Sequence, residues 1–198
     1  MANIRDFRIF LDPGHNGTWT GAYGNGLAEH EVVLDIAKSC KSRLEAYGAT
    51  VGMSRTTHNA LVASDKNLDL SKRVELSNAF NADIFVSIHN NSADSVSANG
   101  VETYTRVGGS TLVKNLAADV NSLVVSRTGM SARNPAVKEA DYVVIKSGNN
   151  AWSILVEVGF ISNTSDATKL GKLSVRTDAG NAIADSIKRF VDSLPESS

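Results

Sequence analysis

The chain has 198 residues, of which 42% are hydrophobic and 21% are charged, and these values are ordinary for a single globular domain. Its formal net charge of -1 gives no electrostatic reason to expect binding to nucleic acid or to an anionic membrane surface. The only cysteine, Cys40, excludes an intramolecular disulfide and a cysteine-rich zinc site. We expect one domain over residues 1–198, with a core at about 8–192 and a tail or the start of a linker at 193–198.

Neither a signal peptide nor a membrane span is evident in the sequence. Residues 1–7 lack the basic and then apolar pattern of a secretory signal. No apolar run approaches the roughly 18 residues that a membrane-spanning helix needs. We therefore predict no membrane span, and a chain that either is made without a signal peptide or had one removed.

The first half of the chain alternates between short apolar runs and amphipathic stretches. An apolar run that begins near Arg8 ends in Asp12-Pro13-Gly14-His15, which is typical of a buried strand followed by a sharp turn. Apolar residues recur every four positions from Val32 to Leu44, as on the buried side of a helix. The elements predicted here are a strand at about 8–12, a glycine-rich loop at 16–26, a helix at 29–47, a strand at 50–53, a polar loop at 54–67 and a helix at 69–80. The last helix is expected to have an apolar inner face of Leu70, Val74, Leu76 and Ala79.

The second half contains the clearest strand, Ile84 to His89, because its apolar run is nearly unbroken. Such a run indicates burial on both faces and a central place in a parallel sheet. The other elements predicted here are a strand at 100–105, a helix around 112–124, an irregular segment at 130–141, strands at 142–145 and 153–158, and a C-terminal helix with apolar residues from 183 to 194. Alternating strands and helices predict an α/β fold: a single domain with a mostly parallel twisted sheet flanked by helices on both faces.

Three of the predicted strands lead to side chains that can bind a metal or move a proton, namely His15, His89 and Glu157. In open α/β sheets, chemistry collects at the carboxyl ends of the strands. A catalytic zinc ion takes three histidine or carboxylate ligands and leaves a fourth position for water. We expect His15 and His89 to be two ligands, and Glu29 or Glu31, at the start of the first helix, to be the third.

Glu157 stands at the end of an apolar strand, where an uncompensated charge is costly. We interpret it as the general base that accepts a proton from water at the zinc site. Each residue taken alone has a simpler interpretation: a strand-end histidine is often structural, Glu157 could pair with a core arginine, and an acidic residue at a helix start favours the helix dipole. One zinc site explains all of them together. Residues 30–34 do not complete the zincin helix motif, because Leu34 stands where its second histidine must be.

Four blocks occur in order along the chain: residues 11–15 (LDPGH), 29–34 (EHEVVL), 87–91 (SIHNN) and 155–163 (LVEVGFISN). Shorter signatures lie between them at Ser54-Arg55-Thr56, Leu70-Ser71-Lys72-Arg73 and Gly100-Val101-Glu102. Together they resemble the zinc-dependent N-acetylmuramoyl-L-alanine amidases of the amidase-3 family, which include bacterial autolysins and phage endolysins. The similarity runs from about Ile9 to Val191.

The resemblance implies that His15, Glu29 and His89 bind one Zn²⁺ per chain and that Glu157 is the catalytic glutamate. It implies peptidoglycan as the substrate, hydrolysis of the amide bond between N-acetylmuramic acid and L-alanine, and action at the bacterial cell wall, extracellular or secreted. It also allows for a separate wall-binding domain beyond the C-terminus. Two alternatives stay open: a zinc peptidase that cuts within the stem peptide, and a non-catalytic cell-wall-binding domain.

Overall fold

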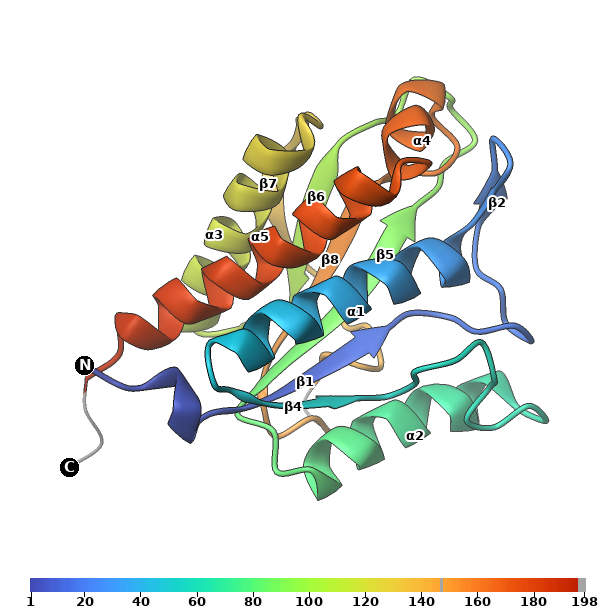
Figure 1. Ribbon diagram of the computed structural model, residues 1–198. Helices are drawn as coiled ribbons and strands as arrows, with labels where there is room; N and C mark the ends of the chain where they lie inside the picture. The colour runs from blue at the N-terminus through green and yellow to red at the C-terminus, as the bar shows by residue number, and fades with distance from the viewer. Residues whose placement is uncertain (147, 196–198) are drawn as a thin grey trace.

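The computed structural model describes residues 1–146 and 148–195, which form a six-stranded sheet packed between helices (Figure 1). The strands of the sheet are β1 Arg8–Pro13, β4 Thr50–Met53, β5 Ile84–Asn91, β6 Val101–Thr105, β7 Ala132–Glu139 and β8 Trp152–Phe160. Their order is β4-β1-β5-β8-β6-β7. β4, β1, β5 and β8 run parallel, β6 runs antiparallel to β8, and β7 runs parallel to β6. One edge, called the C-terminal edge below, therefore contains the ends of β1, β5 and β8 and the starts of β6 and β7.

The helices cover both faces of this sheet, as predicted. They are α1 Glu29–Ala46, α2 Lys66–Ala79, α3 Thr111–Thr128, α4 Thr164–Leu170 and α5 Leu173–Asp192, with a short 3-10 helix at Ile4–Asp6. α1, α3 and α5 lie on one face of the sheet and α2 lies on the other (Figure 1). The larger hydrophobic core fills the space under α1, α3 and α5. A smaller core of Phe10, Phe85, Val144, Ile145 and Leu155 lies on the α2 face.

Three predicted segments differ from the structure. The segment 130–141, expected to be irregular, contains β7, and the strand expected at 142–145 is a turn whose Val144 and Ile145 pack into the smaller core. β7 is an edge strand with mostly exposed or half-buried residues and a proline, so it lacks the apolar run of a buried strand. The loop predicted at 16–26 runs into a small ribbon of β2 Tyr23–Gly24 and β3 Leu27–Ala28. Part of the predicted tail, residues 196–198, lies outside the described residues.

The helix expected at 69–80 begins three residues earlier and buries polar residues beside its expected apolar face. The Asp65 side chain accepts hydrogen bonds from the backbone N–H groups of residues 67 and 68 and so caps α2 at its start. Its fully buried residues are Asp69, Arg73 and Ser77. Of the expected inner face, Leu70, Val74 and Leu76 pack against the smaller core, whereas Ala79 is exposed. The C-terminal helix ends at Asp192, before the predicted apolar residue at 194. No helix among residues 1–146 and 148–195 is long and apolar enough to cross a membrane.

Candidate metal centre and active site

A row of polar side chains crosses the C-terminal edge of the sheet on its α2 face. His89 on β5 is the register partner of Glu157 on β8, and Glu157 is in turn the register partner of Glu102 on β6. Register partners point to the same face of a sheet. Ser87, two residues before His89 on β5, is the register partner of Asp12 on β1. The strand ends that the sequence singled out are therefore neighbours in space.

His15, Glu29 and His89 form one compact cluster at this edge. Their ligand atoms all lie within 4.8 Å of one another. The Glu29 carboxylate lies between the two imidazoles, with Oε2 3.3 Å from His15 Nε2 and Oε1 3.0 Å from His89 Nδ1. The two rings meet edge to face, with centroids 4.9 Å apart. Three nitrogen and oxygen donors at this spacing suit a zinc ion, which takes such a ligand set in catalytic sites.

Local structure fixes the Glu29 carboxylate in place. Glu29 is the first residue of α1, and its side chain is almost fully buried. Oε1 accepts a hydrogen bond from the Asn90 backbone N–H at 3.1 Å, and Oε2 accepts one from the Ala22 backbone N–H at 2.8 Å. Burial by itself raises the pKa of this carboxyl, but the hydrogen bonds to His15 and His89 outweigh it, so the pKa of Glu29 lies well below its usual range. The group is therefore an anion at neutral pH, as a metal ligand must be.

Two glycines leave room for the cluster. A Cβ atom on Gly14 would overlap the imidazole of His89, and a Cβ on Gly21 would overlap both the Glu29 carboxylate and the ring of His15. Gly21 also has a φ of +72°, which favours glycine. The chain thus approaches the three side chains more closely than any other residue type would permit.

Glu157 is partly exposed, but one oxygen of its carboxylate is buried and unpaired. Among the described residues, its Oε2 atom has no hydrogen-bond partner. Burial, and then the negative charges of Glu29 and Glu102, raise the pKa of Glu157 well above its usual value, while His15 acts in the opposite direction. A carboxyl with a raised pKa beside the metal cluster is suited to exchange a proton with a reacting group.

Two buried arginines hold the turn that carries His15. Arg73 donates to the carbonyl oxygens of Pro13 and His15, both at 2.9 Å, while Arg55 donates to those of Pro13 at 3.0 Å and Gly14 at 2.8 Å. Arg73 also pairs with Asp12 at 2.8 Å. Three consecutive backbone carbonyls are thereby fixed, and His15 keeps a φ of +58°.

Asp12 completes this support beneath the cluster. Its carboxylate is fully buried and accepts hydrogen bonds from Ser54 at 2.6 Å and Ser87 at 2.8 Å, besides Arg73. Burial tends to raise the pKa of Asp12, but the Arg73 charge and the two hydroxyl groups lower it below its usual value. No role for Asp12 or the two arginines was predicted from the sequence, although Arg55 lies in the signature Ser54-Arg55-Thr56 and Arg73 in Leu70-Ser71-Lys72-Arg73.

Other reactive side chains lie away from the cluster. Glu31, the alternative to Glu29, is exposed on α1. His30 packs edge to face against His58 rather than against the cluster. Cys40 is buried under α5, where burial raises the pKa of its thiol, so it is a core residue and no nucleophile.

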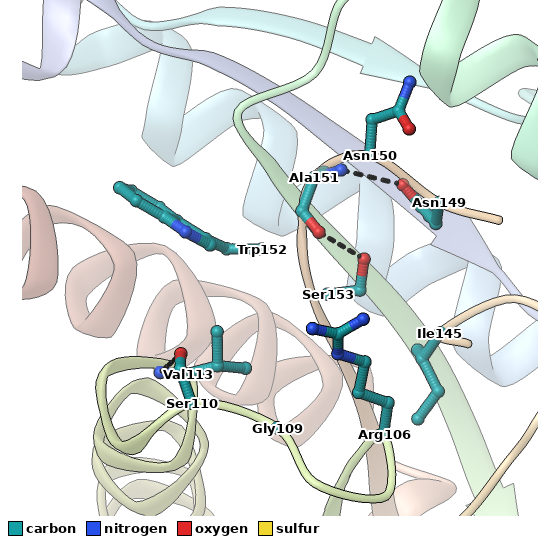
Figure 2. A pocket seen from close by; sticks show the side chains of 10 residues that line it. All are labelled: Arg106, Gly109, Ser110, Val113, Ile145, Asn149, Asn150, Ala151, Trp152 and Ser153. Atoms are coloured by element: carbon teal, nitrogen blue, oxygen red, sulfur yellow. Dashed lines mark hydrogen bonds between the residues drawn. The ribbon is translucent and has the colours of Figure 1, made fainter. Parts of the chain in front are cut away.

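A separate cavity of about 310 Å³ lies at the opposite end of β8, where Trp152 and Ser153 begin that strand. Figure 2 shows Arg106 and the start of α3 on one side of this cavity and the segment 149–151 on the other. None of the four residues predicted for the site lines it. The cavity is therefore not part of the candidate active site.

Comparisons with known proteins agree on one family. A family model described as N-acetylmuramoyl-L-alanine amidase matches residues 9–189. The N-acetylmuramoyl-L-alanine amidase LytC of Bacillus subtilis is 40% identical over 178 residues, which cover 89% of this chain and 34% of LytC. The germination-specific N-acetylmuramoyl-L-alanine amidase of the same organism is 30% identical and matches 92% of this chain and 78% of its own length. The chain thus spans about a third of LytC but most of the germination-specific enzyme.

Solved structures give the same result for the fold. An N-acetylmuramoyl-L-alanine amidase from Clostridium difficile 630 superimposes with a TM-score of 0.85 at 28% identity, covering 96% of this chain and 98% of that one. The catalytic domain of the amidase CwlV from Paenibacillus polymyxa gives 0.83 at 26% identity, covering 95% and 99%. The sheet and helices described above are therefore similar in arrangement to those of solved amidase domains.

Proposed function

Since the chain belongs to the N-acetylmuramoyl-L-alanine amidase family, we propose that it hydrolyses the amide bond between N-acetylmuramic acid and the L-alanine of peptidoglycan stem peptides. The family match covers nearly the whole sheet and its helices, and the related proteins named above carry this activity in their names. On this proposal the substrate is the muramoyl peptide of the bacterial cell wall, and the chain acts outside the cytoplasm.

We propose further that His15, Glu29 and His89 hold one zinc ion. The observation that carries this proposal is the 4.8 Å cluster of two imidazoles and a carboxylate, with the space around it kept open by Gly14 and Gly21. When bound in such a site, zinc lowers the pKa of water from 15.7 towards about 7 and polarises the scissile carbonyl.

Glu157 is proposed to move the proton during the reaction. It lies beside His89 in the register of the sheet, so its carboxylate is within the same group of side chains. Its carboxylate takes a proton from the attacking water and later delivers that proton to the leaving nitrogen of L-alanine. The raised pKa of Glu157 suits the second step, because the carboxyl then keeps the proton until the amine departs.

The residues that support the cluster orient it without taking part in proton transfer. Arg55 and Arg73 hold the carbonyls of residues 13–15, and backbone N–H groups hold the Glu29 carboxylate. Because the imidazole orientations are fixed before substrate arrives, little reorganisation is needed during the reaction.

Digestion of purified peptidoglycan, followed by mass spectrometry, tests the proposed bond. The expected products are intact stem peptides with a free L-alanine amino terminus and glycan strands without peptide. Cuts within the stem peptide would instead support the alternative of a zinc peptidase. Binding to peptidoglycan without any released amino groups would support the alternative of a non-catalytic cell-wall-binding domain.

Metal content tests the assigned residues separately from the bond. His15→Ala and His89→Ala are expected to lose zinc and activity together, whereas Glu157→Gln is expected to keep about one zinc per chain and lose turnover. Full activity after chelation would contradict the proposed chemistry, and loss of zinc in Glu157→Gln would make Glu157 a ligand rather than the proton carrier.

A further inference from the structure

A second buried carboxylate, Glu102, lies next to Glu157 and gathers four donors around it. Its Oε1 accepts hydrogen bonds from Asn91 Nδ2 at 2.6 Å and Tyr104 OH at 2.7 Å. Its Oε2 accepts from Lys138 Nζ at 2.5 Å and Arg133 Nε at 3.2 Å. Burial tends to raise the pKa of Glu102, but the hydrogen bonds from these donors lower it below its usual value. Glu102 is thus a stable anion that is paired with two cations.

Arg133 has hydrogen-bond donors that its contact with Glu102 leaves unpaired. Glu102 brings one negative charge to two cations, so the group carries an excess of one positive charge. Arg133 reaches Glu102 through Nε alone, and among the described residues neither of its Nη atoms has a hydrogen-bond partner. Its guanidinium carbon lies 5.0 Å from the centroid of the Phe160 ring, and its side chain is 34% exposed. The guanidinium is therefore held in place by stacking while two of its nitrogens face no acceptor.

The order of the strands places this guanidinium on the peptide side of the scissile bond. Across the C-terminal edge the sheet runs from β1, which leads to His15, and β5, which carries His89, to β8 with Glu157 and then to β6 and β7. The scissile carbonyl belongs at the cluster and the leaving nitrogen at Glu157, so the stem peptide continues over β6 and β7. Strands lie about 4.8 Å apart, and the Arg133 guanidinium reaches back from β7 to Glu102 on β6, the strand next to β8. It is therefore about two residues of extended chain beyond Glu157.

We infer that Arg133, with Lys138 beside it, binds a carboxylate of the stem peptide within the first residues after the scissile bond. This inference rests on the proposed function. An arginine with two free nitrogens matches a carboxylate in a two-point hydrogen bond, and compensation of Glu102 by Lys138 and Tyr104 keeps its own charge from repelling the substrate. Arg133 is accordingly a specificity-determining residue for acidic stem peptides.

Two synthetic N-acetylmuramoyl peptides test the proposed carboxylate site directly. They differ only in the residue after L-alanine, whose side chain carries a carboxylate in one peptide and a carboxamide in the other. Wild type is expected to prefer the carboxylate form. Arg133→Gln should reduce kcat/KM for the carboxylate form by about 10- to 100-fold more than for the carboxamide form, as expected for a lost hydrogen bond to a charged group. The loss should appear as a raised KM with little change in kcat, since this contact is remote from the reacting atoms.

Arg189→Gln is the matched control, because Arg189 lies on α5 with a side chain 60% exposed and only a loose contact to Asp119 at 3.6 Å. It should leave the substrate preference unchanged. Equal losses on both substrates in Arg133→Gln would show a structural role and overturn the inference. No loss on either substrate would overturn it as well.

Binding measurements separate this inference from the proposed function. In the Glu157→Gln background, calorimetric titration with the same two peptides is expected to show tighter binding of the carboxylate form, and Arg133→Gln should abolish that difference. A wild-type protein that cleaves both peptides without preference would refute the carboxylate site and leave the amidase proposal intact. A protein that cleaves neither peptide yet keeps the Arg133-dependent binding difference would refute the amidase proposal and leave the carboxylate site intact. Absence of any binding difference would refute the carboxylate site whatever the activity.

Discussion

Replacement of Arg73 by methionine should be among the most damaging single changes in the protein. Arg73 has only 1% of its surface exposed, and its guanidinium lies between two buried carboxylates, 2.8 Å from Asp12 and 3.0 Å from Asp69. Methionine keeps much of the apolar volume but removes the charge and all the donors. The change therefore isolates the electrostatic part of the interaction.

The magnitude follows from what the missing cation leaves behind. Asp12 is fully buried and Asp69 is 2% exposed, so neither carboxylate can be solvated in place. Breaking a buried ion pair by removing one partner typically costs about 3–5 kcal/mol. We expect the free energy of unfolding of Arg73→Met to fall by this amount, which is a large part of the 5–15 kcal/mol typical of a whole domain.

Urea denaturation followed by circular dichroism measures this loss, with Lys72→Met as the matched control. Lys72 is the neighbouring residue on α2, its side chain is 39% exposed, and it pairs only with the exposed Glu75, so its removal should cost less than about 1 kcal/mol. Arg73→Lys keeps the charge but loses the planar fork, so we expect a loss between those of Lys72→Met and Arg73→Met. If Arg73→Met does not fold, a loss in Arg73→Lys no larger than in Lys72→Met would refute the reasoning. A loss in Arg73→Met no larger than in Lys72→Met would refute the reasoning.

Two further predictions concern the packing of α5. Asp185 accepts hydrogen bonds from Arg43, Tyr47 and Arg127; burial tends to raise the pKa of its carboxyl, but these contacts lower it to about 2. As the pH falls, the unfolded chain binds a proton at Asp185 before the folded chain does, so Asp185 stabilises the fold above about pH 4 and loses this effect as the pH falls towards 2. Between these pH values the urea midpoint should therefore fall less in Asp185→Asn than in wild type. Equal falls in the two proteins would contradict the lowered pKa of Asp185. A Cβ on Gly180 would lie 2.8 Å from the Cys40 backbone nitrogen and overlap the Ile36 carbonyl, so Gly180→Ala should lose about 1–3 kcal/mol of stability through overpacking, although helix propensity alone predicts a gain of about 1 kcal/mol. The control is Ser174→Ala, since Ser174 is exposed on the same helix, and it should change thermal stability little. A stabilised Gly180→Ala would show that α1 and α5 can move apart.

The strands were predictable where burial on both faces leaves a nearly unbroken apolar run. β5 and β8 are of this kind, and their polar ends identified His89 and Glu157. The choice between Glu29 and Glu31 could not be made from spacing alone, because both lie in the first turn of α1. Successive helical residues are turned by about 100°, so Glu31 points to solvent while Glu29 faces the two histidines.

The polar support of the site gave no signal in the hydrophobic pattern. Asp69, Arg73 and Ser77 repeat every four residues on the buried face of α2, where periodicity analysis looks for apolar side chains. Arg73 is paired there with Asp12, which lies more than fifty residues away along the chain. Only the tertiary structure shows this partner. β7 was missed for a different reason, since an exposed edge strand needs no apolar run.

The reversed direction of β6 has a consequence for how this domain can diversify. Because β6 begins at the C-terminal edge, the connection at 92–100 and the short link before β7 both end beside Glu157 and Arg133. These segments are largely exposed and contribute few residues to the main core, so they tolerate changes of length and composition. Libraries randomised at 92–99 should therefore yield variants with altered peptide preference and unaltered melting temperature, which makes this connection a natural place to retarget the domain.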